Sequence, residues 1–77
     1  MNSIYVDFHN MTADGKVRLN VIGSIRDLNR QGLVLTDGLV VRLYSEDFEV
    51  TGTVEFSERE HMWVASFSWD ERKSLDP

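Results

Sequence analysis

Histidine, serine and acidic side chains are the groups in this chain that could carry out catalysis or bind a metal, because the chain has no cysteine. The two histidines, His9 and His61, form neither of the short H-x-H and H-x-x-x-H pairs of a zinc site. Carboxylates gather at Glu46, Asp47 and Glu49, but without the interleaved glycine of a calcium loop. No serine lies in a nucleophile-elbow sequence. We therefore predict a non-enzymatic protein with no catalytic residue, metal site or cofactor.

A second group of polar residues lies in the sequence DLNRQG, from Asp27 to Gly32. It resembles the D/N-x-S/N-x-x-G signature of PilZ domains, which bind cyclic di-GMP on a β-barrel. The resemblance implies that Asp27, Asn29 and Gly32 contact the guanine and the ligand-facing backbone, and Arg30 completes the predicted ligand-binding set. Asn29 stands where that family usually has serine. The family's R-x-x-x-R pair lies well upstream of the signature, whereas Arg26 and Arg30 overlap it here.

Three segments near the C-terminal end of the chain predict consecutive antiparallel strands with one apolar face. They are 39–44, 49–57 and 61–69, and apolar residues alternate along each. Folding them about their turns pairs Leu43 with Val50, and Phe56 with Trp63. We expect Trp63 to be buried against Phe56 in the core.

Two of these strands also carry apolar residues on the opposite face, at Val40, Tyr44, Met62 and Val64. A one-sided sheet in water alternates apolar with polar residues, so this second face needs a cover. The helix and the N-terminal hairpin could supply it, or another subunit could. We predict that these residues form an interface, either in a homodimer or with a protein partner.

The N-terminal region predicts a hairpin about the turn Asp14-Gly15. Ile4, Val6 and Phe8 alternate with polar residues, which is typical of a half-buried strand. Pairing across the turn places Thr12 opposite Val17, Asn10 opposite Leu19, and Phe8 opposite Val21.

A short helix is expected over 24–31, capped by Ser24 and ended by Gly32. Ile25 and Leu28 share one side of it and should be buried. This capped helix accounts for the same polar residues without any ligand. A short strand at 33–35 and a turn at Asp37-Gly38 are expected to follow, with a kink at this corner of the sheet.

Length and charge set limits on the function. The chain has 77 residues with a net charge of −5, which fits one small domain and disfavours nonspecific binding to nucleic acid. No apolar run is long enough to cross a membrane, and no secretory signal is recognisable, so we expect a cytoplasmic protein with no membrane partner.

Together these features predict a mostly β fold, a small antiparallel curled sheet of five to six strands or an SH3-like barrel, with one short helix. A single domain is expected over 1–70 and a frayed polar tail over 71–77. The predicted function is binding of a protein partner or of a second copy. The alternative is a module that binds a small ligand, with cyclic di-GMP at the 27–32 segment as the candidate.

Overall fold

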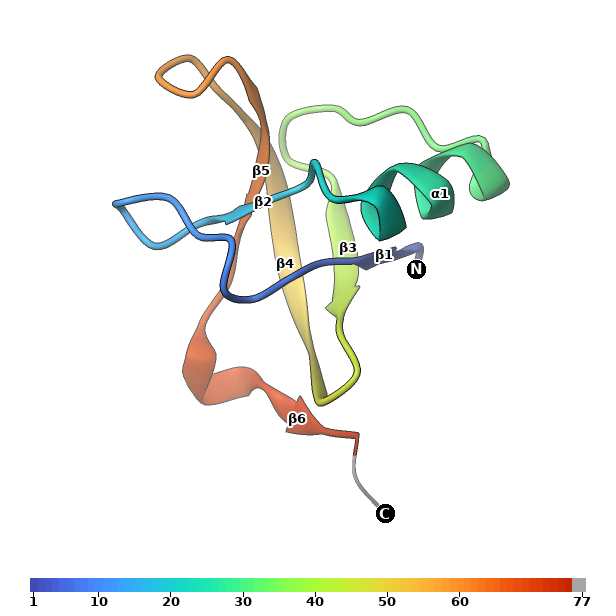
Figure 1. The fold of residues 1–77 in the computed structure, drawn as a ribbon, viewed down its shortest axis with the longest axis vertical. Coiled ribbons are helices and arrows are strands. Elements are labelled where there is room, and N and C mark those ends of the chain that lie inside the picture. Colours follow the sequence, from blue (N-terminus) through green and yellow to red (C-terminus); the bar gives the residue numbers. More distant parts are fainter. Residues whose placement is uncertain (76–77) are drawn as a thin grey trace.

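The fold is known from a computed structural model that describes residues 1–75. This part of the chain forms the following elements: β1 (Ser3–Tyr5), β2 (Val17–Arg18), α1 (Ile22–Gln31), β3 (Val40–Tyr44), β4 (Phe48–Ser57), β5 (Met62–Ser66), the short 3₁₀ helix η1 (Trp69–Glu71) and β6 (Lys73–Ser74). The strands form one curled sheet in the order β1-β3-β4-β5-β2, and β6 pairs with one end of β4 (Figure 1). The predicted fold class, a small curled and mostly β sheet with one short helix, is confirmed.

The central meander β3-β4-β5 has the predicted register. Leu43 lies opposite Val50, and Phe56 lies opposite Trp63. The strict alternation of apolar and polar residues specifies this register, because a slip by one residue would turn every apolar side chain toward water. Trp63 packs edge-on against Phe56, with 5.2 Å between the ring centroids. Its expected full burial is wrong, because Trp63 is half-buried and Phe56 is 38% exposed.

The first strand, β1, pairs in parallel with β3, whereas a hairpin with residues 17–21 was expected. A tight turn separates the two halves of the predicted strand: the Asn10 N–H donates to the Asp7 carbonyl at 2.8 Å, and the His9 N–H donates to Asp7 Oδ1 at 2.9 Å. The chain then turns at Gly15, whose φ of 85° suits glycine. A parallel pair needs a long crossover connection, and here the connection contains this hairpin and α1.

The predicted register of that hairpin is wrong by one residue. Val17 lies opposite Met11 rather than Thr12, and the Arg18 N–H donates to the Asn10 carbonyl at 3.0 Å. The shift follows from the turn itself, where the Thr12 hydroxyl accepts the Lys16 N–H at 3.0 Å and the Thr12 N–H donates to the Lys16 carbonyl at 2.7 Å.

The helix α1 begins earlier than predicted and presents a different face. Its N-cap is Val21, with no side-chain cap, so the predicted Ser24 cap is wrong. Ile25 is 49% exposed, whereas Leu28 packs against the core as expected. Gly32 ends the helix in the left-handed conformation at φ 60°, as predicted, and the Leu33 N–H donates to the Leu28 carbonyl at 3.0 Å.

No strand forms at 33–35, so that prediction is wrong for this described segment. Leu33 and Leu35 instead pack against the core from an irregular connection that leads to β3 (Figure 1). The Asp37 carboxylate fixes the following turn by accepting the Phe56 N–H at 2.8 Å. The expected frayed tail is in part ordered, because β6 pairs antiparallel with the start of β4; residues 76–77 of that tail lie outside the described residues.

A single cluster of buried side chains forms the core between the curled sheet and the N-terminal segment. Its buried members are Ile4, Val6, Phe8, Val17, Leu19, Val41, Leu43, Val50, Val54 and Ala65. All three apolar residues of the predicted first strand belong to it, although only part of that segment forms a strand. The alternating pattern therefore predicted correctly which side chains of this segment are buried, although it did not predict the strand pairing.

Candidate functional site

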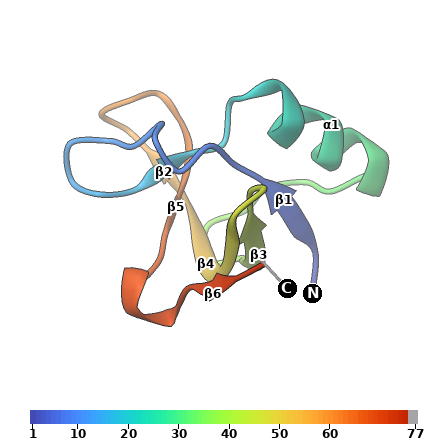
Figure 2. The ribbon, with the colours of Figure 1, turned by 60° about the horizontal axis from the view of Figure 1, so that its bottom comes forward.

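The helix α1 lies beside β1, an edge strand of the sheet (Figure 2). The side chains that α1 directs at the β1 backbone are polar. The Ser24 hydroxyl donates to the Tyr5 carbonyl at 2.5 Å, and the Tyr5 N–H donates to Asp27 Oδ2 at 2.9 Å. The Gln31 side-chain amide donates to the Ser3 carbonyl at 2.7 Å and accepts the Ser3 N–H at 3.3 Å. Three helix side chains thus satisfy the outer donors and acceptors of β1, which covers this edge against pairing with another strand.

Asp27, the first residue of the predicted ligand set, is only 3% exposed. Besides the Tyr5 N–H, its carboxylate accepts a hydrogen bond from the Tyr44 hydroxyl at 2.7 Å and pairs with Arg30. Burial by itself raises the pKa of Asp27, but the hydrogen bonds from Tyr44, Tyr5 and Arg30 outweigh it and hold this pKa below its usual range. Asp27 is therefore ionised at neutral pH, and its carboxylate oxygens are bonded within the chain.

The other residues of that set converge on Asp27 only in part. Arg30 pairs with it, whereas Asn29 and Gly32 are exposed, and Asn29, two positions from Asp27 on the helix, does not face it. A groove of about 420 Å³ does lie beside α1, and Arg26, Arg30 and Tyr44 help to line it. Binding of cyclic di-GMP by this segment stays a prediction.

The four predicted interface residues lie in different surroundings. Val64 is fully buried within the chain, and Tyr44 is half-buried with its hydroxyl bonded to Asp27. Met62 is half-buried, and Val40 is 48% exposed. Val40 therefore presents the largest exposed fraction of the four to solvent. The homodimer stays a prediction.

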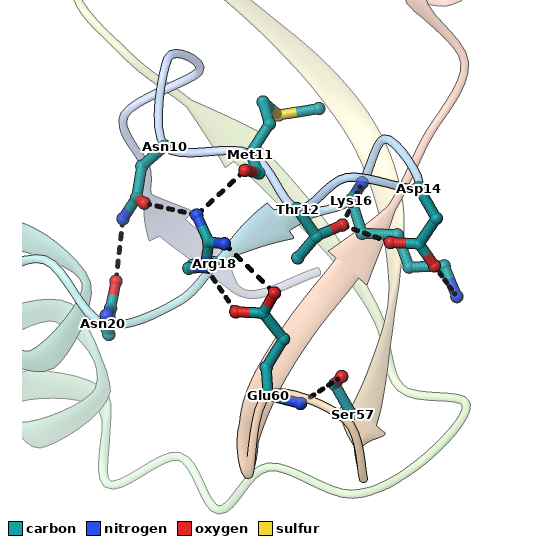
Figure 3. Close-up of polar contacts among 9 residues, drawn as sticks. All are labelled: Asn10, Met11, Thr12, Asp14, Lys16, Arg18, Asn20, Ser57 and Glu60. Atoms are coloured by element: carbon teal, nitrogen blue, oxygen red, sulfur yellow. Dashed lines mark hydrogen bonds and ion pairs between the residues drawn. The ribbon is translucent and has the colours of Figure 1, made fainter.

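Charged residues of the two strands on either side of β5 flank the buried Val64. Arg18 and Glu55 are its cross-strand neighbours, so their side chains flank it on the same face. Arg18 pairs with Glu60 through Nε at 2.7 Å and Nη2 at 3.1 Å, and its Nη1 donates to Asn10 and to the Met11 carbonyl (Figure 3). The hydrogen bond from Arg18 lowers the pKa of Glu60. This network clamps the hairpin to the β4–β5 turn, and its guanidinium donors are bonded internally.

The most distinctive surface feature is a groove of about 410 Å³, which we call the aromatic groove. It is lined by residues 5–9, by residues 45–48 and by Trp69. Phe8, Phe48 and Trp69 contact one another with 4.7–5.6 Å between ring centroids, and Phe67 packs edge-on against Trp69 at 5.1 Å. Phe8 is buried in the core, whereas Trp69 is 41% exposed. The core therefore holds an indole ring at the surface in a fixed orientation.

The polar residues of this groove are mainly acidic. Asp7, Glu46 and Asp47 are exposed and line it. The Tyr5 hydroxyl donates to Glu46 at 2.6 Å; this bond lowers the pKa of Glu46 and raises that of Tyr5. At neutral pH the pair is thus a carboxylate and a neutral phenol. The exposed His9 lies 3.3 Å from Asp7, between the ring Nδ1 and Oδ1.

On Trp69 there is already a cation from the chain itself. The guanidinium of Arg72 lies over the indole, with 5.7 Å from Cζ to the ring centroid, and its Nη1 donates to the Trp69 carbonyl at 2.7 Å. The segment that carries Arg72 is attached beside the groove, because β6 pairs with β4 and the Leu75 N–H donates to the Asp47 carbonyl at 2.9 Å.

The sequence did not predict this groove as a site. Trp69 entered only as the last residue of the predicted strand 61–69, and Glu46, Asp47 and Glu49 were considered only as a calcium loop. The residues come from three segments that are far apart in the chain. The parallel pairing of β1 with β3 brings residues 5–9 beside residues 45–48, and the pairing of β6 with β4 brings the segment with Trp69 to them. The available signal was an aromatic residue, Trp69, at the last position of the predicted strand 61–69.

These observations define a small, mostly β domain with one edge-covering helix and one acidic aromatic groove. Among residues 1–75, no group of three or more histidine and acidic side chains is placed to hold a metal ion. Within the same range, neither helix has the length and apolarity needed to cross a membrane. Comparisons with protein-family models, curated proteins and solved structures found no match, so the likeness to SH3-like barrels stays a prediction.

Proposed function

We propose that this domain binds a basic segment of a partner protein in the aromatic groove. The observation that carries the proposal is the half-exposed ring of Trp69, which lies against other aromatic rings beside the carboxylates of Asp7, Glu46 and Asp47. An aromatic face attracts a cation through its quadrupole, and the carboxylates attract it through their charge. A guanidinium or ammonium group in this groove meets both.

The contact between Arg72 and Trp69 supports the choice of a cation. The chain places its own guanidinium on this ring, and the acidic, exposed surface around the ring favours a positive charge there. The net charge of −5 acts in the same direction over longer distances, since it attracts basic partners and repels acidic ones. The proposed role is therefore recognition of a basic protein segment, without catalysis.

The expected affinity is modest. A cation over an exposed aromatic ring contributes about 0.5–1 kcal/mol, and each exposed ion pair about 0.2–1 kcal/mol. One such aromatic contact and three such ion pairs reach about 4 kcal/mol at their upper limits, so one basic side chain binds at best in the millimolar range. Recognition of a whole partner then requires further contacts around the groove. The proposed setting is the cytoplasm, where a chain without cysteine has no thiol or disulfide exposed to the reducing conditions.

Titration of the ¹⁵N-labelled protein with a capped peptide of alternating arginine and glycine tests this function. We expect saturable shifts at Phe8, Phe48 and the Trp69 indole N–H, and none of this kind with a matched glutamate–glycine peptide. Trp69→Ala should weaken binding by about two- to fivefold, the share of one exposed cation–aromatic contact.

Two matched variants serve as controls. Phe56→Ala removes another exposed aromatic ring, outside the groove, and should leave peptide affinity unchanged. Glu46→Gln should weaken binding more than Glu58→Gln, which removes an exposed carboxylate from the β4–β5 turn. Equal shifts with both peptides, or no saturable shift at millimolar peptide, would overturn the proposal.

A further inference from the structure

The aromatic groove borders a second hollow, the groove beside α1. Tyr5 and Glu46 line both, and their side chains are joined by the 2.6 Å hydrogen bond from the Tyr5 hydroxyl to the carboxylate. The two grooves have similar volumes, about 410 and 420 Å³. They therefore form one longer surface, with the Tyr5–Glu46 pair as their shared wall.

The charged side chains differ between the two ends of this surface. On the far side of the shared wall from Asp7 and Asp47, the groove beside α1 is lined by Arg26 and Arg30, which are one helical turn apart, and by the buried Asp27. The charge of Arg30 is partly balanced, because it pairs with the buried Asp27. Arg26 is exposed and forms no ion pair within residues 1–75. This end thus has a guanidinium available for an anion.

We infer that the segment recognised by this surface is dipolar: an extended stretch of a partner protein with a basic side chain over Trp69 and an acidic side chain at Arg26. The inference rests on the proposed function, since it extends the basic segment of that proposal beyond the shared wall. Charge complementarity at both ends carries it. A carboxylate at Arg26 gains an ion pair, whereas a second basic side chain there meets Arg26 and Arg30 and is repelled.

This arrangement gives the domain a means of selection that a single acidic groove lacks. An acidic groove alone binds any polybasic segment, and more tightly as the positive charge increases. With the arginines of α1 next to it, a uniformly basic segment that crosses the shared wall loses beside α1 part of what it gains in the aromatic groove. The surface therefore selects a charge pattern rather than a net charge.

Two sets of capped peptides test the inference by NMR titration. The first set has one arginine and one glutamate separated by glycine–serine spacers of increasing length, and the second has glutamine in place of the glutamate. The longest dimension of the molecule is 37 Å, and an extended residue spans at most about 3.3–3.6 Å, so spacers of up to about eleven residues cover every separation on the surface.

At the best spacer length, the arginine–glutamate peptide should bind about three- to fivefold more tightly than its glutamine counterpart, the effect of one exposed ion pair. Arg26→Gln should remove this advantage and leave the affinity of the glutamine peptide unchanged. Arg59→Gln, which removes an exposed arginine from the β4–β5 turn, should leave the advantage of the arginine–glutamate peptide unchanged.

Equal affinity of both peptides at every spacer length would overturn the dipolar inference while leaving the basic-segment proposal intact. An advantage that survives Arg26→Gln would also overturn it, because the glutamate would then act elsewhere. If neither peptide binds, the proposed function fails, and this inference fails with it.

Discussion

At the scale of single residues, Asp27 shows what the sequence could not assign. Its type and position suggested either a ligand contact or a polar residue of a capped helix. The structure buries it against the Tyr5 N–H and the Tyr44 hydroxyl, both from strands. Neither partner is visible from spacing, because both contacts depend on α1 lying along the edge of β1. A polar residue on a helix has no sequence signature that separates a buried edge contact from a solvated one.

Substituting Asp27 by asparagine should lower the free energy of unfolding at neutral pH by about 1–3 kcal/mol, because the Tyr5 N–H, the Tyr44 hydroxyl and Arg30 all lose a charged acceptor. Asn29→Ala, an exposed position on the same helix, should change it by less than about 0.5 kcal/mol. Urea unfolding followed by circular dichroism measures both.

The pH dependence of stability in the parent protein and in Asp27→Asn tests the charge of Asp27. The pKa of Asp27 is lowered in the folded state, so its ionised form contributes stability above the unfolded-state pKa of about 3.9. That contribution is lost as pH falls through the lower folded-state pKa. The difference between the parent and Asp27→Asn should therefore shrink in acid. A difference that is the same at neutral and at strongly acidic pH would show that the charge of Asp27 does not stabilise the fold.

At the scale of elements, alternation predicted the meander β3-β4-β5 and its register, because a period of two specifies both the face and the pairing of a strand. The same rule identified Ile4, Val6 and Phe8 as buried. The apolar pattern of the helix was right only for Leu28, which packs against the core. Ile25 is exposed, and polar side chains of the helix contact β1 instead. A pattern of apolar residues tells which side of a helix prefers an apolar neighbour, but here the neighbour is a strand edge with free hydrogen-bonding groups.

Within the meander, burial ranks the cost of substitutions. Leu43→Ala should lower the free energy of unfolding by about 2–5 kcal/mol, because Leu43 is fully buried in the core. Trp63→Ala should cost less than the roughly 3–5 kcal/mol of a fully buried ring, because Trp63 is half-buried and its partner Phe56 is partly exposed. Thermal unfolding of the two variants gives the order. Complete unfolding of Trp63→Ala beside a stable Leu43→Ala would reverse it.

At the scale of the whole molecule, the fold class could be predicted and the groove could not. Each strand of the meander has its own alternating pattern, so its strands can be predicted one at a time from the sequence. The groove depends on how distant pieces meet: Phe8 follows the first strand, Phe48 opens β4, and Trp69 begins η1. Their meeting needs the parallel crossover from β1 to β3, which no local turn signal specifies. Sites formed between segments therefore require the topology first.

The fold also bears on whether the protein is a monomer or a homodimer. The homodimer was predicted because four apolar residues share the second face of the sheet. One of them, Val64, is fully buried within the chain between its cross-strand neighbours Arg18 and Glu55, and the Tyr44 hydroxyl is bonded to Asp27. Val40, at 48% exposed, is then the main apolar contact left for a partner. One such side chain is too little for a stable interface, which usually buries about 1,200–2,000 Å² in total.

We therefore expect light scattering to give the mass of one chain, 8.9 kDa, across a wide range of concentrations. Twice that mass would support the predicted homodimer. In that case, Val40→Glu would test the face, since it places a charge at an exposed position without disturbing the core. Val64→Glu cannot serve this purpose, because a charge buried at a fully enclosed position unfolds the chain whatever its assembly. A dimer that persists in Val40→Glu would place the interface elsewhere on the molecule.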